Sequence, residues 1–238
     1  MLEIIGCTYM KRSFSNSPFH AGLLAARANL VPGVLIWSIM LAVVLAYYHH
    51  DLSRSMLEEI AEWKRHYGYA FSFVATGLAG GVLPELLKVV LFQNGKPARE
   101  NIRNISFGFP FWGVLGCIID AFYRVQAIWF GADPSVSVLI QKVLVDQFIF
   151  SPLFGTAVIV WVYEWRRLRF RPEALRGIFT LNFYRSRVFP SVIAGWGVWI
   201  PAVSIIYSLP SMLQIPLFVL ATSFWSLIIT FIAASHQD

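Results

Sequence analysis

Long stretches of apolar residues run through the chain, separated by short polar links. A helix that spans a membrane needs about 20 mostly apolar residues, with a range of roughly 17–25. Six segments reach or approach this length: residues 31–48, 69–92, 107–128, 140–163, 188–207 and 215–234. Strands of a membrane barrel would alternate apolar and polar residues over about ten positions, and these segments do not alternate. The pattern predicts an all-α, multi-pass transmembrane helical bundle of six hydrophobic helices, at least four of them spanning.

The link between the first two segments has a different pattern. Over residues 51–66, apolar positions that include Leu57 and Ile60 recur at helical spacing, and charged residues cover the other faces. This spacing predicts an amphipathic helix that lies in the membrane interface, with a solvated connector as the alternative. Ser55 and Glu58, within this stretch, have the spacing of a capping box.

Composition supports a membrane protein and excludes several other classes. Of the 238 residues, 57% are hydrophobic and only 13% are charged, whereas soluble domains carry about 25% charged residues. An ordinary soluble enzyme, a disordered chain and a disulfide scaffold are therefore excluded. The net charge of +6 is explained by basic residues in the links, so no nucleic-acid partner is expected.

The distribution of Lys and Arg predicts the orientation in the membrane. The links over residues 129–139 and 208–214 have no Lys or Arg, while the link over residues 164–187 has seven Arg. Because cytoplasmic loops are enriched in Lys and Arg, both termini and the arginine-rich link are expected on one side. We divide the chain into a basic N-terminal tail, 1–30, and a single integral membrane helical domain, 31–238. The tail has the composition of a positive-inside segment or of a transit peptide.

Ionisable residues inside the apolar segments are the candidate functional residues. Each costs about 2.5–3.5 kcal/mol near the bilayer centre on insertion scales, and they occur as pairs at i,i+3 or i,i+4 spacing that can neutralise each other. The pore or polar-cluster candidates are Glu85, Lys88, Asp120, Arg124, Lys142, Asp146 and Gln147.

The short link before residue 140 predicts a helical hairpin that gathers four of these charges, those of Asp120, Arg124, Lys142 and Asp146, in one half of the membrane. Two interpretations remain open. The pairs either fix the register of the bundle, or they line one mouth of a watery path.

Catalytic and cofactor motifs are absent from the sequence. It contains no H-E-x-x-H, G-x-S-x-G or phosphate-binding glycine loop, and its histidines lie outside the apolar centres. The sequence therefore predicts a protein without catalytic residues, metal or cofactor. Aromatic residues near segment ends, such as Trp129 and Tyr207, are interpreted as interfacial anchors.

The fourth segment carries a specific motif. The stretch Lys142-x-x-x-Asp146-Gln147-x-x-Phe150-x-Pro152 resembles the K-x-x-x-D-Q-x-x-F-x-P motif of the Mpv-seventeen family, also named for the twenty-two-kilodalton peroxisomal membrane protein. Further landmarks of this family match in order over residues 69–234. The matching residues outside the fourth segment include Phe122, Tyr123, Trp199 and Trp225. The chain departs from the family pattern at Cys117, Asp120 and Ser226, where the family has proline, histidine and asparagine.

This resemblance implies a small multi-pass protein of a bacterial inner membrane or of an organelle membrane, mitochondrial inner or peroxisomal. The family has no established enzyme chemistry and is implicated in channel-like passage of small solutes. The resemblance thus implies a channel or transporter, with a membrane scaffold or assembly factor as the alternative. The expected partner is the lipid bilayer, and a homo-oligomer is compatible with it. Anionic lipids are expected at four arginines, Arg166, Arg167, Arg169 and Arg171.

Overall fold

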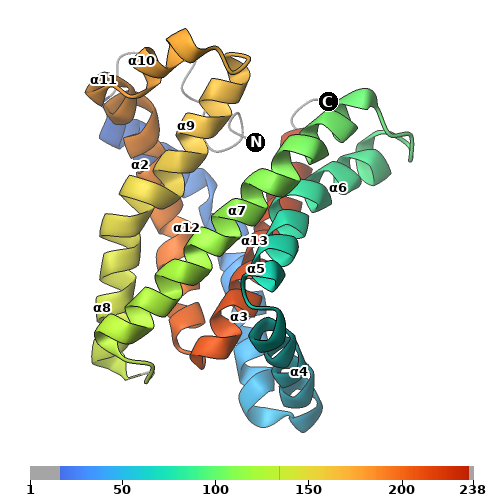
Figure 1. The fold of residues 1–238 in the computed structure, drawn as a ribbon, viewed down its shortest axis with the longest axis vertical. Helices are drawn as coiled ribbons and strands as arrows, with labels where there is room; N and C mark the ends of the chain where they lie inside the picture. Colours follow the sequence, from blue (N-terminus) through green and yellow to red (C-terminus); the bar gives the residue numbers. More distant parts are fainter. Residues whose placement is uncertain (1–16, 134, 236–238) are drawn as a thin grey trace. The chain divides into compact units, whose positions relative to one another are not determined.

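The predicted all-α architecture is confirmed by the structure, a computed structural model that describes residues 17–133 and 135–235. No strand occurs in these ranges (Figure 1). Six helical segments are long and apolar enough to cross a membrane: Leu30–His49, Tyr69–Phe92, Arg99–Phe130, Val136–Arg167, Leu181–Tyr207 and Ser211–Ile228. Lys11 and Arg12 of the predicted basic tail lie outside the described residues.

The chain divides into two compact units. The first comprises Met1–Val34 and Val143–Pro201, and the second comprises Leu35–Lys142 and Ala202–Asp238. The first unit contains α2 Pro18–Ala28, η3 Asp146–Gly155, α9 Thr156–Arg167, η4 Pro172–Ala174, α10 Leu175–Ile178, α11 Leu181–Phe183 and η5 Tyr184–Val188. The second contains α4 Asp51–Tyr67, α5 Tyr69–Gly77, η2 Leu78–Val82, α6 Leu83–Phe92, α7 Arg99–Phe130 and α13 Ser211–Ser235. A unit boundary falls within each of α3 Leu30–His49, α8 Val136–Val145 and α12 Phe189–Tyr207.

Close contact between α5–η2 and α7 organises the second unit, and these elements lie side by side in Figure 1. A Cβ added at Gly81 would lie 2.4 Å from the backbone carbon of Gly108, and one at Gly77 would lie 2.8 Å from the carbonyl oxygen of Phe109. The backbones can approach this closely only because these positions carry no side chain. The G-x-x-x-G step from Gly77 to Gly81 is therefore a packing feature.

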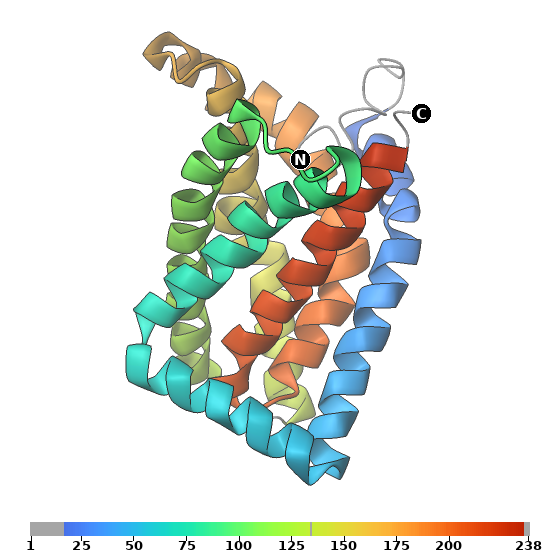
Figure 2. The same ribbon diagram turned by 90° about the vertical axis from the view of Figure 1, so that its right-hand side faces the viewer.

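Helix α4 runs crosswise over the ends of α3 and α5 in the second unit (Figure 2). Its N-cap is His50, whose Nδ1 accepts a hydrogen bond from the backbone N–H of Ser53 at 3.4 Å. Arg54 donates to the carbonyl oxygens of Tyr47 and Tyr48 at 3.1 and 2.9 Å, and so caps the C-terminal turn of α3. The helix is present over the predicted range, and Ser55 lies within its first turns, so its capping-box spacing with Glu58 does not mark the N-cap.

In the first unit, α2 packs against α12. A Cβ at Gly22 would lie 2.7 Å from Cβ of Ile193, and one at Gly197 would lie 3.6 Å from Cβ of Ala26. The side chain of Ser17 caps α2 by accepting the N–H of His20 at 3.3 Å. A small core of α9, η5 and α12 lies in the same unit and consists of Ala157, Val160, Val188 and Val192. The sequence pattern did not indicate α2, because its apolar run is too short for a span.

Candidate functional site

The carboxylate of Asp120 is the centre of a buried polar cluster in the second unit. Its Oδ2 accepts hydrogen bonds from Lys64 Nζ and Ser72 Oγ, both at 2.7 Å, and its Oδ1 accepts from Arg124 Nε at 3.1 Å. Asp120 is 2% exposed and Lys64 is 6% exposed. The predicted Asp120–Arg124 pair is therefore confirmed, and the cluster joins α4, α5 and α7.

The sequence places the buried members of this cluster on faces that pack inward. Lys64 follows Leu57 by seven residues and Ile60 by four, so it belongs to the apolar stripe of α4. On α7, Gly116 lies one turn before Asp120 and faces Thr76 of α5, where an added Cβ would lie 2.4 Å from Thr76 Oγ1. Helix α5 can therefore approach α7 closely enough for a side chain of its first turn to reach Asp120. Lys64 was not among the residues predicted from the sequence, although its position on the apolar stripe was the available signal.

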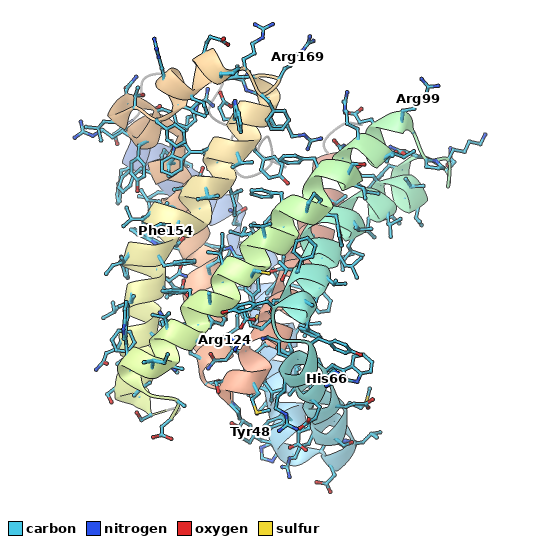
Figure 3. The ribbon with its side chains drawn as sticks, viewed as in Figure 1. Tyr48, His66, Arg99, Arg124, Phe154 and Arg169 are labelled. Atoms are coloured by element: carbon cyan, nitrogen blue, oxygen red, sulfur yellow. The ribbon has the colours of Figure 1, made fainter. Side chains whose placement is uncertain are left out.

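Arg124 is the outer member of the cluster. Its side chain is 52% exposed and projects from α7 in Figure 3. The guanidinium carbon lies 4.9 Å from the centroid of the Tyr69 ring, within the range of a cation–π contact. Arg124 therefore connects the buried carboxylate to the exterior of the second unit.

Lys142 is a second buried cation of this unit, with 2% exposure. Its Nζ lies 5.9 Å from the ring centroid of Tyr207, and no carboxylate of the described second unit forms an ion pair with it. Gln126 Nε2 donates to the Lys142 carbonyl oxygen at 3.1 Å. The buried Oε1 of Gln126 has no hydrogen-bond partner among the described residues. These groups form a polar region with unused hydrogen-bonding capacity.

Tyr207 lies inside the second unit. It is 2% exposed, and its ring centroid lies 5.1 Å from that of Tyr123, which packs in turn against Phe218. Its interpretation as an interfacial anchor is therefore wrong, because the fold buries this ring beside Tyr123 and Lys142. Trp129, by contrast, is 67% exposed.

A third polar cluster surrounds Glu85. Lys88 Nζ donates to its Oε1 at 2.6 Å, as the spacing predicts, and Asn104 donates to the same oxygen at 3.2 Å. Asn101 Nδ2 donates to Oε2 at 2.8 Å. On α7, Asn101 precedes Asp120 by 19 residues, which corresponds to about 28 Å along a helix. The two carboxylate clusters therefore belong to opposite halves of a hydrocarbon layer about 30 Å thick.

In the first unit, the motif residues Asp146, Gln147 and Pro152 form a single π-helical segment, η3. Gln147 Nε2 donates to Asp146 Oδ1 at 2.9 Å. Trp196 Nε1 donates to the carbonyl oxygen of Gln147 at 2.8 Å, and the Tyr184 hydroxyl donates to that of Pro152 at 3.1 Å. Since backbone groups in a bilayer need partners within the protein or in a watery cavity, these side chains stabilise the irregular helix. Lys142 belongs to the second unit and Asp146 to the first.

The remaining motif residues take structural positions. Tyr123 is buried, and the ring of its neighbour Phe122 lies 6.3 Å away. Trp199 lies on α12 of the first unit beside Gly195, and Trp225 is partly buried on α13. Among the described residues, no group of three or more His, Cys, Asp or Glu side chains could hold a metal ion.

The length and apolar character of its helices define the chain as a multi-pass helical membrane protein. No protein-family model matches the chain, and neither a curated protein nor a solved structure matches it.

Proposed function

We propose that the protein is a non-enzymatic channel or transporter for small solutes, and that the buried polar side chains of the second unit line its path. The observation that carries this proposal is Lys142. It is buried in a membrane-spanning segment, and its contact in the second unit is an aromatic ring. An ionisable residue in such a position is by default a candidate for a solute or ion pathway.

Packing alone does not account for this arrangement. Apolar side chains of similar volume are often as stabilising as buried charges, or more so. The unpartnered Oε1 of Gln126 adds a second argument, because buried polar atoms normally find a partner in the protein or in water. A hydrated path beside Lys142 and Gln126 supplies that partner.

The charge of the lining favours anions. In the polar region around Asp120 and Lys142, the second unit carries three cations, Lys64, Arg124 and Lys142, against one carboxylate, Asp120. The Glu85–Lys88 pair is balanced by itself. Since charged side chains that line a pore select ions of opposite sign, we infer that the path prefers small anionic solutes.

Replacing Lys142 by methionine tests the proposed path. We expect the purified wild-type protein in planar bilayers to conduct with a preference for chloride over potassium. In Lys142→Met this preference should fall, because one lining cation is removed, while Lys142→Arg should keep it. The reversal potential in a potassium chloride gradient measures the change. Lys96→Met is the matched control, because it removes an exposed link lysine and should leave the reversal potential unaltered.

A membrane scaffold without transport activity is the second candidate, and the Asp120 cluster favours it. All three donors to this carboxylate come from the protein, so it binds α4 to the bundle without any solute. Absence of conductance in folded wild-type protein, or the same ion selectivity in Lys142→Met, would support the scaffold and refute the path.

The resemblance of the fourth segment to the Mpv-seventeen family supports the channel proposal. We propose a bacterial inner membrane or an organelle membrane as the location.

We also propose that the arginine-rich link binds anionic lipid headgroups. Arg167 pairs with Glu164 at 2.8 and 2.6 Å, whereas Arg169 and Arg171 follow the end of α9, and Arg169 is labelled in Figure 3. A well-placed basic residue contributes about 1 kcal/mol to such binding. The variant with Arg166, Arg169 and Arg171 changed to glutamine should lose the enrichment of fluorescent anionic lipid around the protein, measured by energy transfer. Arg167→Gln should reduce this lipid enrichment less than the triple variant does. Equal enrichment in all variants would contradict the proposal.

A further inference from the structure

A groove with apolar walls lies within the second unit, between α3, α4, α5 and α13. Its cavity volume is about 240 Å³. The walls include Val43 of α3, Leu57 and Ile60 of α4, and Phe71 of α5. The other wall is one face of α13, where the lining residues recur at helical spacing: Leu213, Pro216, Leu217, Leu220 and Ser223.

The chemistry of the walls excludes a polar occupant. Ser223 is the one lining residue with a polar side chain, and its hydroxyl already donates to the carbonyl oxygen of Val219 at 2.8 Å. An apolar cavity of 150 Å³ stays dry and binds apolar guests such as benzene. A larger groove of the same character, in a segment surrounded by lipid, therefore fits a hydrocarbon chain better than water.

The position and length of the groove match one leaflet of the bilayer. One end lies under α4, whose residues outside the groove include the exposed charges of Glu58, Glu59, Glu62 and Arg65, as expected for a helix at the membrane surface. From Leu213 to Ser223 the lining face of α13 extends over ten residues, or about 15 Å. This is half of a hydrocarbon layer about 30 Å thick, which is the depth that a lipid tail occupies.

We propose that this groove binds one acyl chain of a membrane phospholipid, and that α4 covers the chain at the membrane surface. The apolar face of α4 supplies Leu57 and Ile60 to the groove. One turn after Ile60, Lys64 attaches α4 to Asp120. The inference is independent of solute passage, because the groove residues are distinct from those that surround Lys142.

The experiment is photocrosslinking of the full-length protein in phosphatidylcholine vesicles that contain a phosphatidylcholine with a diazirine on one acyl chain. Labelled positions are mapped by mass spectrometry. We expect labels to concentrate on Leu57 and Ile60 of α4 and on Leu217 and Leu220 of α13, above the level on exposed faces such as that of Val90 on α6. Leu220→Trp fills the groove and should reduce labelling on α4 about tenfold, a change equivalent to about 1.4 kcal/mol. Met212→Trp, on the exposed face of the same helix, should leave labelling unchanged.

Several outcomes would overturn the proposal. Labelling spread evenly over all lipid-facing residues would show annular lipid alone, and crosslinks between two copies of the chain would show that protein fills the groove. Displacement of the label by free oleate but not by unlabelled phospholipid would identify a fatty acid as the occupant. Ser223→Leu serves as a milder filling variant if Leu220→Trp does not fold. The labelled positions in the wild-type protein test occupancy of the groove without either variant.

Discussion

Replacing Asp120 by alanine is expected to lower the free energy of unfolding by about 3–5 kcal/mol, because removing one partner of a buried ion pair leaves the other charge uncompensated. The stranded partner is Lys64, whose side chain is 8% exposed. Leaving Arg124 without its carboxylate partner costs less free energy, because its side chain is 52% exposed and reaches water or headgroups. Unfolding in detergent, followed by tryptophan fluorescence, measures the change.

Two companion variants separate the buried pair from general effects of charge removal. Glu62→Ala removes the exposed Arg65–Glu62 pair on the same helix as Lys64, and should cost roughly 0–1 kcal/mol. The double variant Lys64→Met, Asp120→Leu should recover most of the stability lost in Asp120→Ala, since apolar residues can replace a buried pair at little cost. If the double variant is as unstable as the sum of its single variants, the pair does not hold α4 to the bundle.

Replacing Gly81 by alanine is expected to destabilise the protein by about 1–3 kcal/mol or more, because the new methyl group has no space. Its Cβ would lie 2.4 Å from backbone atoms of Gly108 and Phe109. Backbone cannot rotate aside as a side chain can, so η2 and α7 must separate along their contact. The same unfolding measurement checks this expectation.

Gly177→Ala is the matched control for the Gly81 variant. An added Cβ at Gly177 meets no atom within 4 Å, and this glycine lies in the short helix α10 with ordinary backbone angles. Because alanine favours a helix over glycine, the control should be neutral or stabilising. Equal destabilisation by the two substitutions would contradict the role of Gly81 as a contact point between backbones.

The parts of the structure that the sequence predicted depend on local spacing. The six apolar segments follow from length and hydropathy, and the Glu85–Lys88 and Asp120–Arg124 pairs follow from helical geometry, since residues three or four positions apart share a face. Helix α4 was also predictable, because its charged and apolar residues separate onto different faces.

The parts that escaped prediction depend on contacts between residues distant in sequence. Lys64 and Asp120 are 56 residues apart, so no periodicity connects them. Helix α2 is too short to register as a span, and it is stabilised by close packing of Gly22 against α12. Tyr207 lies near a segment end, as an interfacial anchor would, but the fold buries its ring against Tyr123.

The order of the Lys64–Asp120 pair along the chain bears on how the protein is made. Synthesis proceeds from the N-terminus, so α4 and its lysine leave the ribosome before α7 does. An aspartate without a partner inside a span would cost up to about 2.5–3.5 kcal/mol. Asp120 instead enters the bilayer when its counter-ion, with the Ser72 hydroxyl, is already available on earlier segments. The chain thus delivers Lys64 and Ser72 before Asp120, and these two donors add to Arg124 of the third span itself as partners of the carboxylate.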